Sequence, residues 1–156
     1  PGLQGGPHIN QIAATAIALY EAQQPGFKRY ALQVVKNARA LSDALKKHGW
    51  RIVSGGTDTH LLLVDVISQG ITGKDASDLL EKIGIIVNKN TIPYDERPPM
   101  NPSGIRIGTP TITSRGMKEN EMRKIAELIH QTLLREVPAS KVKKAVLKLC
   151  REFPIR

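Results

Sequence analysis

The sequence predicts a two-layer α/β domain in which a short sheet is covered by helices on one side. Apolar residues at helical spacing fill both ends of the chain, and short apolar runs bounded by turn residues fill its middle. Apolar residues make up 40% of the 156, enough for the core of one domain, or of one domain plus a piece of another. No apolar run approaches the roughly 20 residues that a transmembrane helix needs, so we expect no membrane span.

Two helices are expected in the first third of the chain. Apolar residues follow helical spacing over residues 9–20, and Pro25 and Gly26 interrupt this pattern. A second helical pattern covers residues 27–45. Basic residues follow in its last turn and Gly49 ends it, which is the usual chemistry of a helix C-terminus.

The pattern then changes to strands and shorter helices. Four short apolar runs predict strands over residues 51–53, 61–66, 85–87 and 104–108. Between the second and third of these, Thr72 can cap a helix that Gly84 ends. After the fourth, helical spacing predicts helices over residues 117–134 and 140–152, separated at Pro138.

The most informative segment is residues 88–110, NKNTIPYDERPPMNPSGIRIGTP. It opens with a long loop, residues 88–102, whose four prolines make it stiff and favour a binding wall. It then places Arg106 inside an apolar strand, where a charge is costly unless something pairs with it. No acidic residue lies in SGIRIGTP, so a carboxylate ligand is a candidate partner. At this point an arginine that faces solvent, or that pairs with a distant Asp, remains an alternative.

Charge and cysteine content restrict the function classes. The net charge of +9 is typical of proteins with acidic partners, but the basic residues are spread along the chain. With two Phe, one Trp and three Tyr, no aromatic platform for bases is visible, so we expect no nucleic-acid binding. The single Cys150 excludes an internal disulfide and agrees with a reducing, cytoplasmic compartment. One Cys and four scattered His give no metal-ligand spacing.

Several motifs line up in one order along the whole chain: PGLQGGP, VVKNA, VSGGTDTHLLLVD, VNKN, SGIRIGTP and SRG. This series resembles the C-terminal part of serine hydroxymethyltransferase, a pyridoxal-phosphate enzyme that moves a one-carbon unit between serine and tetrahydrofolate. The resemblance implies the small domain of a fold-type I enzyme, with a short, mostly antiparallel sheet, in a cytoplasmic homodimer with shared sites. It assigns residues 1–24 to the end of the large domain and a connecting helix, and residues 25–156 to the small domain.

The resemblance also implies roles for particular residues. Arg106, in the SGIR motif, would bind the carboxylate of serine or glycine. Gly5 and Gly6 would approach the cofactor phosphate of the neighbouring subunit, although a plain tight turn is the alternative. Contacts to folate are implied for Asn90, Pro98, Pro99 and Met100. The alternative for Asn90 is a bond to its own loop backbone.

Some positions match the family only by analogy or depart from it. Arg115 and Thr109 lie near the site by analogy, with a surface or capping role as the alternative. Where the family usually has a His after QGGP this chain has Asn10, and where it usually has the Asn of TDNH this chain has Thr59. Neither departure touches Arg106.

The chain lacks the family's cofactor lysine, which lies in a Thr-rich segment followed by His-Lys. None of the thirteen lysines has that context, so we expect this polypeptide alone to be inactive. Two other interpretations stay open. One is the small domain of another fold-type I enzyme, such as an aminotransferase, against which the NKN and QGGP motifs argue. The other is a non-catalytic, basic binding module.

Overall fold

The computed structural model describes residues 2–155 and divides the chain into two compact units, residues 1–32 and residues 33–156. The first unit contains α1 (Ile9–Ala22) and the beginning of α2 (Pro25–Lys47). No side chain of α1 is buried, and Ile12 and Ile17 are exposed. The predicted helix is thus present. The assignment of residues 1–24 to a larger domain stays a prediction.

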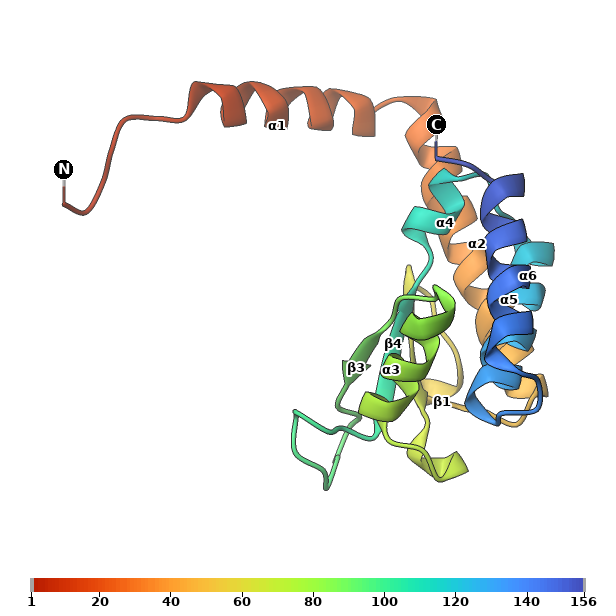
Figure 1. The fold of residues 1–156 in the computed structure, drawn as a ribbon. Helices are drawn as coiled ribbons and strands as arrows, with labels where there is room; N and C mark the ends of the chain where they lie inside the picture. Colours follow the sequence, from red (N-terminus) through yellow and green to blue (C-terminus); the bar gives the residue numbers. More distant parts are fainter. Residues whose placement is uncertain (1, 156) are drawn as a thin grey trace. The chain divides into compact units, whose positions relative to one another are not determined.

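The second unit is an antiparallel sheet with helices, as the sequence predicts (Figure 1). The strands are β1 (Arg51–Ile52), β2 (Leu61–Asp65), β3 (Asn88–Asn90) and β4 (Gly104–Gly108), in the order β1-β2-β4-β3. The helices after α2 are α3 (Gly73–Ile83), α4 (Pro110–Ser114), α5 (Glu119–Leu133) and α6 (Ala139–Glu152), with short 3-10 turns over Val53–Gly55 and Ile67–Gln69. Helix α3 contacts β3, β4, α5 and α6.

One face of the sheet is buried in a single apolar core. The two central strands pair so that Leu62 lies opposite Ile107 and Val64 opposite Ile105, and all four side chains are buried. Successive side chains in a strand point to opposite faces, so these four share one face. They belong to the same cluster as apolar residues of α2, α3, α5 and α6. The other sheet face carries Arg106 and Asn88 together with the partly buried Leu61 and Leu63.

The third strand lies three residues later than the sequence predicts. Residues 85–87 form no strand, and β3 is built from Asn88–Asn90 instead. The reason is the end of α3. Gly84 has the left-handed backbone that ends a helix, and the Ile85 N–H donates to the Leu80 carbonyl as part of the same cap. The N–H of Ile85 is thus already bonded within the helix cap, and pairing with β4 begins only at Asn88.

The predicted start of α3 is confirmed, whereas β1 and β2 each end one residue earlier than predicted. The Thr72 hydroxyl accepts a hydrogen bond of 3.1 Å from the Asp75 N–H and so caps α3. Within residues 2–155, no helix combines the length and apolar character needed to cross a bilayer.

Candidate substrate-binding site

Arg106 lies on the exposed face of the sheet. Its neighbours Ile105 and Ile107 point into the core, so Arg106 faces the opposite way. Strand pairing places Leu63 of β2 on one side of it and Asn88 of β3 on the other. The sequence interpretation of a buried charge in an apolar strand is therefore corrected: the strand is buried on one face only, and the guanidinium lies on the other.

The guanidinium of Arg106 has few partners among residues 2–155. It donates there from Nη2 to Asn88 Oδ1, at a long 3.4 Å. Among residues 2–155, no carboxylate lies within ion-pair distance of it. By contrast, Arg51 on the same face is paired with the buried Asp65 at 2.5 Å. Arg106 therefore retains donors that can fork onto an incoming carboxylate.

Asn90 lies on the same face as Arg106. It pairs with Gly104, two residues before Arg106, and the period of two along both strands puts both side chains on one side. The Asn90 Nδ2 donates to the Thr91 carbonyl at 2.7 Å, so the bond named above as the alternative to a folate contact is present. The Oδ1 atom of its amide is left as an acceptor.

Residues 91–103 form the loop between β3 and β4, and Asp95 holds it together. The Asp95 carboxylate accepts hydrogen bonds from the backbone N–H groups of Ile92 (3.2 Å), Arg97 (3.0 Å) and Ser103 (2.9 Å) and from the Ser103 hydroxyl (2.7 Å). The sequence analysis did not select Asp95. Asp is nevertheless a common turn residue, because its carboxylate accepts hydrogen bonds from nearby backbone N–H groups. Pro98, Pro99 and Met100 lie exposed at the far end of this loop.

These bonds determine the ionisation of Asp95. Partial burial opposes the charged form, but the hydrogen bonds from Ser103, Arg97 and Ile92 outweigh it and hold the Asp95 pKa well below its usual value of 3.8. A pKa that is lower in the folded state stabilises the fold above the usual value. That contribution is complete at neutral pH and is lost as the pH falls below 3.8 toward the lowered pKa.

We expect Asp95→Asn to loosen this loop. An amide in place of the carboxylate loses the charge and turns an NH2 toward at least one of the backbone donors, leaving that N–H without an acceptor. Hydrogen exchange at Ile92, Arg97 or Ser103 should accelerate by about tenfold or more, as expected for loss of a charge-assisted bond. The control is Asp78→Asn, which removes a surface partner of Lys74. Equal exchange in the two variants would contradict this role for Asp95.

Known proteins are similar to this chain along its length. A family model for serine hydroxymethyltransferase matches residues 1–129. The chain belongs to the serine hydroxymethyltransferase family. The curated serine hydroxymethyltransferase of Acidobacterium capsulatum is 53% identical to it over 158 residues, which covers 99% of this chain. The chain spans about 37% of the length of that relative.

Gly5 and Gly6 lie in the first unit, and the space around both residues is open. No heavy atom lies within 4 Å of a Cβ built at either position, and neither has a positive φ. Within the part of the chain that the structure describes, their N–H groups donate no hydrogen bond. The fold of residues 2–32 therefore does not itself require glycine here.

Two further family positions have structural roles in this chain. Arg115 donates from Nε to the Phe153 carbonyl at 2.6 Å and from Nη2 to the Cys150 carbonyl at 2.7 Å, so it caps the C-terminus of α6. Thr109 is buried, and its hydroxyl donates to the Val34 carbonyl of α2 at 2.9 Å. Its N–H donates to the His60 carbonyl at 3.0 Å. These contacts support the capping alternative for Arg115 and a structural one for Thr109.

Proposed function

We propose that the protein to which this chain belongs interconverts serine plus tetrahydrofolate with glycine plus methylene-tetrahydrofolate. The observation that carries the proposal is the exposed guanidinium of Arg106, without a carboxylate partner among the described residues, on a strand of this family. An unpaired arginine on a rigid sheet is well suited to hold the carboxylate of an amino acid in one orientation.

Arg106 contributes binding and orientation to this reaction. A bidentate pair fixes both the distance and the plane of the substrate carboxylate, and so it fixes the direction of the bonds at the substrate Cα. Strand β4 supplies the rigidity, because it is paired on both sides by β2 and β3. Asn88 meets the guanidinium only at 3.4 Å, so little must be broken when a carboxylate arrives.

Asn90 and the loop of residues 91–103 are proposed to contact folate. The Asn90 amide shares the face of Arg106 and keeps its Oδ1 as an acceptor for a ring N–H. The exposed Met100 offers a soft apolar surface for a ring, with Pro98 and Pro99 as its stiff neighbours. Asp95 holds both ends of this loop at fixed positions.

Pyridoxal phosphate would supply the electron sink for breaking the Cα–Cβ bond of serine. The donor groups of this chain that fit its phosphate are the N–H groups of Gly5 and Gly6, which are exposed and donate to no described atom. The absence of a side chain at both positions lets the backbone approach an anion closely. A cytoplasmic homodimer, in which Gly5 and Gly6 serve the neighbouring subunit, completes the proposal.

A chimera tests the proposal directly. This chain would replace the matching 37% of the Acidobacterium capsulatum relative, and tetrahydrofolate-dependent serine cleavage would be measured with added pyridoxal phosphate. We expect the chimera to cleave serine and the 156-residue chain alone to show no turnover, because none of its lysines has the context of the cofactor lysine. Transamination without folate-dependent cleavage would instead favour an aminotransferase. Serine cleavage by the chain alone would contradict the predicted inactivity.

A further inference from the structure

A groove of about 540 Å³ lies between α2 and α5, within the second unit. It is lined by Lys36, Arg39, Ala40, Asp43, Ala44, Lys47, His48, Glu119 and Arg123. The groove uses none of the residues assigned above to substrate, cofactor or folate. It is therefore a separate feature whose chemistry can be derived from its own side chains.

Four cations line the groove against two carboxylates, and one of these cations, Arg39, is paired with Asp58 outside the groove. Three of the cations, Lys36, Arg39 and Lys47, follow one another on α2 at spacings of three and eight residues, which places them along one side of the helix. Arg123 comes from α5 on the facing side. Cations on both sides of a concave surface focus positive potential into it more than a flat patch does.

The two carboxylates do not cancel this charge, because each also has a cation outside the groove. Asp43 is paired with Lys46 at 2.9 Å. The pKa of Glu119 is lowered, first by a hydrogen bond from its own backbone N–H and against partial burial, then by the Gln33 side chain and by the charges of Lys36 and Lys118. Glu119 is thus ionised, and its carboxylate already accepts hydrogen bonds from groups of this chain.

Lys47 has no ion pair to the part of the chain that the structure describes. Arg123 donates only to Asn120 Oδ1, at 2.6 Å, and has no carboxylate partner there. Between these cations, Ala40 and Ala44 form an apolar floor on α2. The groove thus offers unneutralised donors at its rim and an apolar surface at its base, which is how sites for small organic ions are built.

We propose that this groove binds a small organic anion carrying two or more negative charges, such as a phosphate ester or an oligocarboxylate. Lys47 and Arg123 hold the anion from opposite sides, and Arg39 joins them. A phosphate or carboxylate oxygen matches the guanidinium forks of the two arginines. The apolar part of the ligand rests on Ala40 and Ala44.

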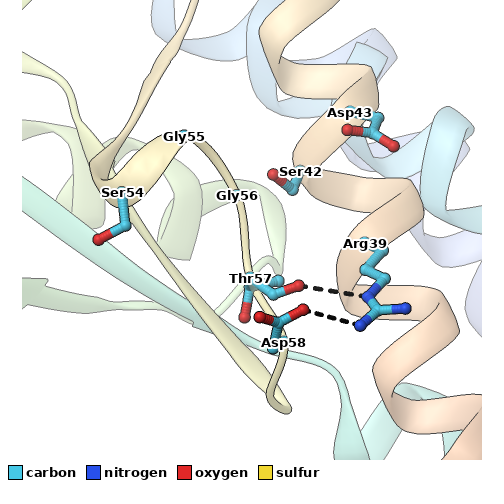
Figure 2. A pocket seen from close by; sticks show the side chains of 8 residues that line it. All are labelled: Arg39, Ser42, Asp43, Ser54, Gly55, Gly56, Thr57 and Asp58. Carbon is cyan, nitrogen blue, oxygen red and sulfur yellow. Dashed lines mark hydrogen bonds and ion pairs between the residues drawn. The ribbon is translucent and has the colours of Figure 1, made fainter.

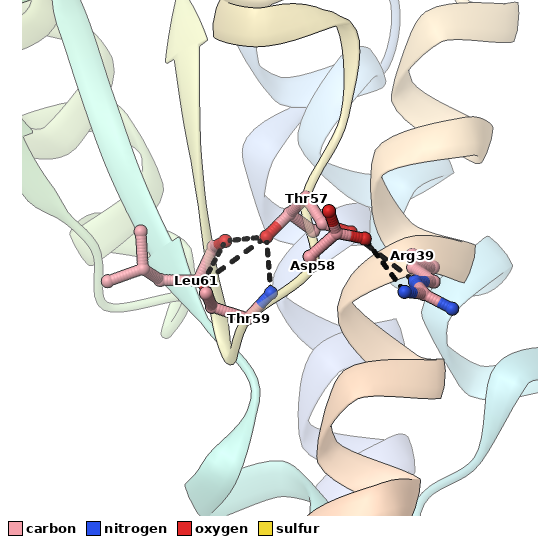
Figure 3. Close-up of polar contacts among 5 residues, drawn as sticks. All are labelled: Arg39, Thr57, Asp58, Thr59 and Leu61. Carbon is pink, nitrogen blue, oxygen red and sulfur yellow. Dashed lines mark hydrogen bonds and ion pairs between the residues drawn. The ribbon is translucent and has the colours of Figure 1, made fainter.

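Arg39 connects the groove to the sheet. It donates from Nη2 to Asp58 Oδ1 at 2.7 Å and from Nε to the Thr57 carbonyl at 3.4 Å (Figure 2). Both partners lie in the loop before β2, and the Thr57 hydroxyl donates to the Leu61 carbonyl at 2.6 Å (Figure 3). Asp58 is highly exposed, so water can replace Arg39 as its partner. An anion in the groove competes with Asp58 for the Arg39 guanidinium. Its binding therefore weakens the contacts that Arg39 makes with the loop before β2.

Titration calorimetry of the purified protein at about 0.15 M salt tests the proposal, with inorganic pyrophosphate and citrate as probes. We expect at least one of them to bind with a Kd below about 1 mM. The probe that binds more tightly identifies the class, phosphate ester or carboxylate. The double variant Lys47→Gln/Arg123→Gln should raise this Kd at least tenfold. Both side chains are exposed, so the fold is kept.

The matched control is Lys143→Gln/Lys144→Gln, which removes the same charge from the exposed face of α6. It should change the Kd by less than twofold. Equal weakening in both double variants would mean that only the net charge of +9 attracts anions, and the proposal would fail. It would also fail if neither probe bound at this salt concentration. Amide signals of Asp58 and Thr59 should shift on binding, and unchanged signals would remove Arg39 from the site.

Discussion

Replacing Gly73 by alanine will lower the free energy of unfolding of the 156-residue chain by about 3 kcal/mol, an overpacking cost at the upper end of the usual range. Gly73 is the buried first residue of α3. A Cβ there would lie 2.1 Å from the Gly104 carbonyl oxygen and 3.0 Å from that of Pro102. Both contacts are backbone atoms, so no side chain can rotate away. The clash must move either the start of α3 or the start of β4.

The effect has a sign opposite to that of intrinsic helix propensity. Alanine is favoured over glycine in a helix by about 1 kcal/mol, so a site with room would gain stability. Gly26 in α2 provides the control, because the nearest atom to its Cβ position is the end of the Arg29 side chain at 3.9 Å. Urea unfolding should show a lower midpoint for Gly73→Ala and an unchanged or higher one for Gly26→Ala. Equal midpoints would mean that the approach of α3 to β4 is looser than the structure shows.

The approach of Gly73 to Gly104 illustrates which features of the fold the sequence could predict and which it could not. Local chemistry predicted the two ends of α3, because the Thr72 cap and the Gly84 stop depend only on neighbouring residues. The close approach of Gly73 to Gly104 depends on residues 31 positions apart, and no local pattern reports it. The misplaced third strand has the same cause. Residues 85–87 are apolar enough for a strand, but pairing with β4 decides where the ladder begins.

The candidate site divides in a similar way. The residue type and the apolar neighbours of Arg106 were enough to select it, and the structure adds the face on which it lies. Asp95 escaped selection because its importance lies in four hydrogen bonds that close the loop, three of them from backbone groups. The Asp residue type indicates a turn, but the sequence does not show that the Ser103 N–H, eight residues away, returns to it. Arg115 was visible in a motif, but its carbonyl partners at the end of α6 lie 35 and 38 residues away.

The sheet also predicts what loss of Arg106 will do in the active chimera. Arg106→Ala should lower kcat/KM for serine about 100- to 1000-fold, since removing one partner of a charge-assisted pair costs roughly 3 to 4 kcal/mol. Stability should stay within about 0.5 kcal/mol, because the side chain is exposed and its hydrogen bond to Asn88 is long. A loss of activity with unchanged stability separates a substrate contact from a structural one.

The lysine variant decides how Arg106 acts. Arg106→Lys keeps the charge but cannot donate two parallel hydrogen bonds in a fixed plane, so we expect it to lose nearly as much activity as Arg106→Ala. Arg151→Lys on the exposed side of α6 makes the same chemical change away from the sheet and should leave kcat/KM unchanged. Near-normal activity of Arg106→Lys would show that a point charge is enough. The orientation provided by β4 would then not limit the reaction, because a flexible ammonium group does not transmit the strand geometry to the substrate.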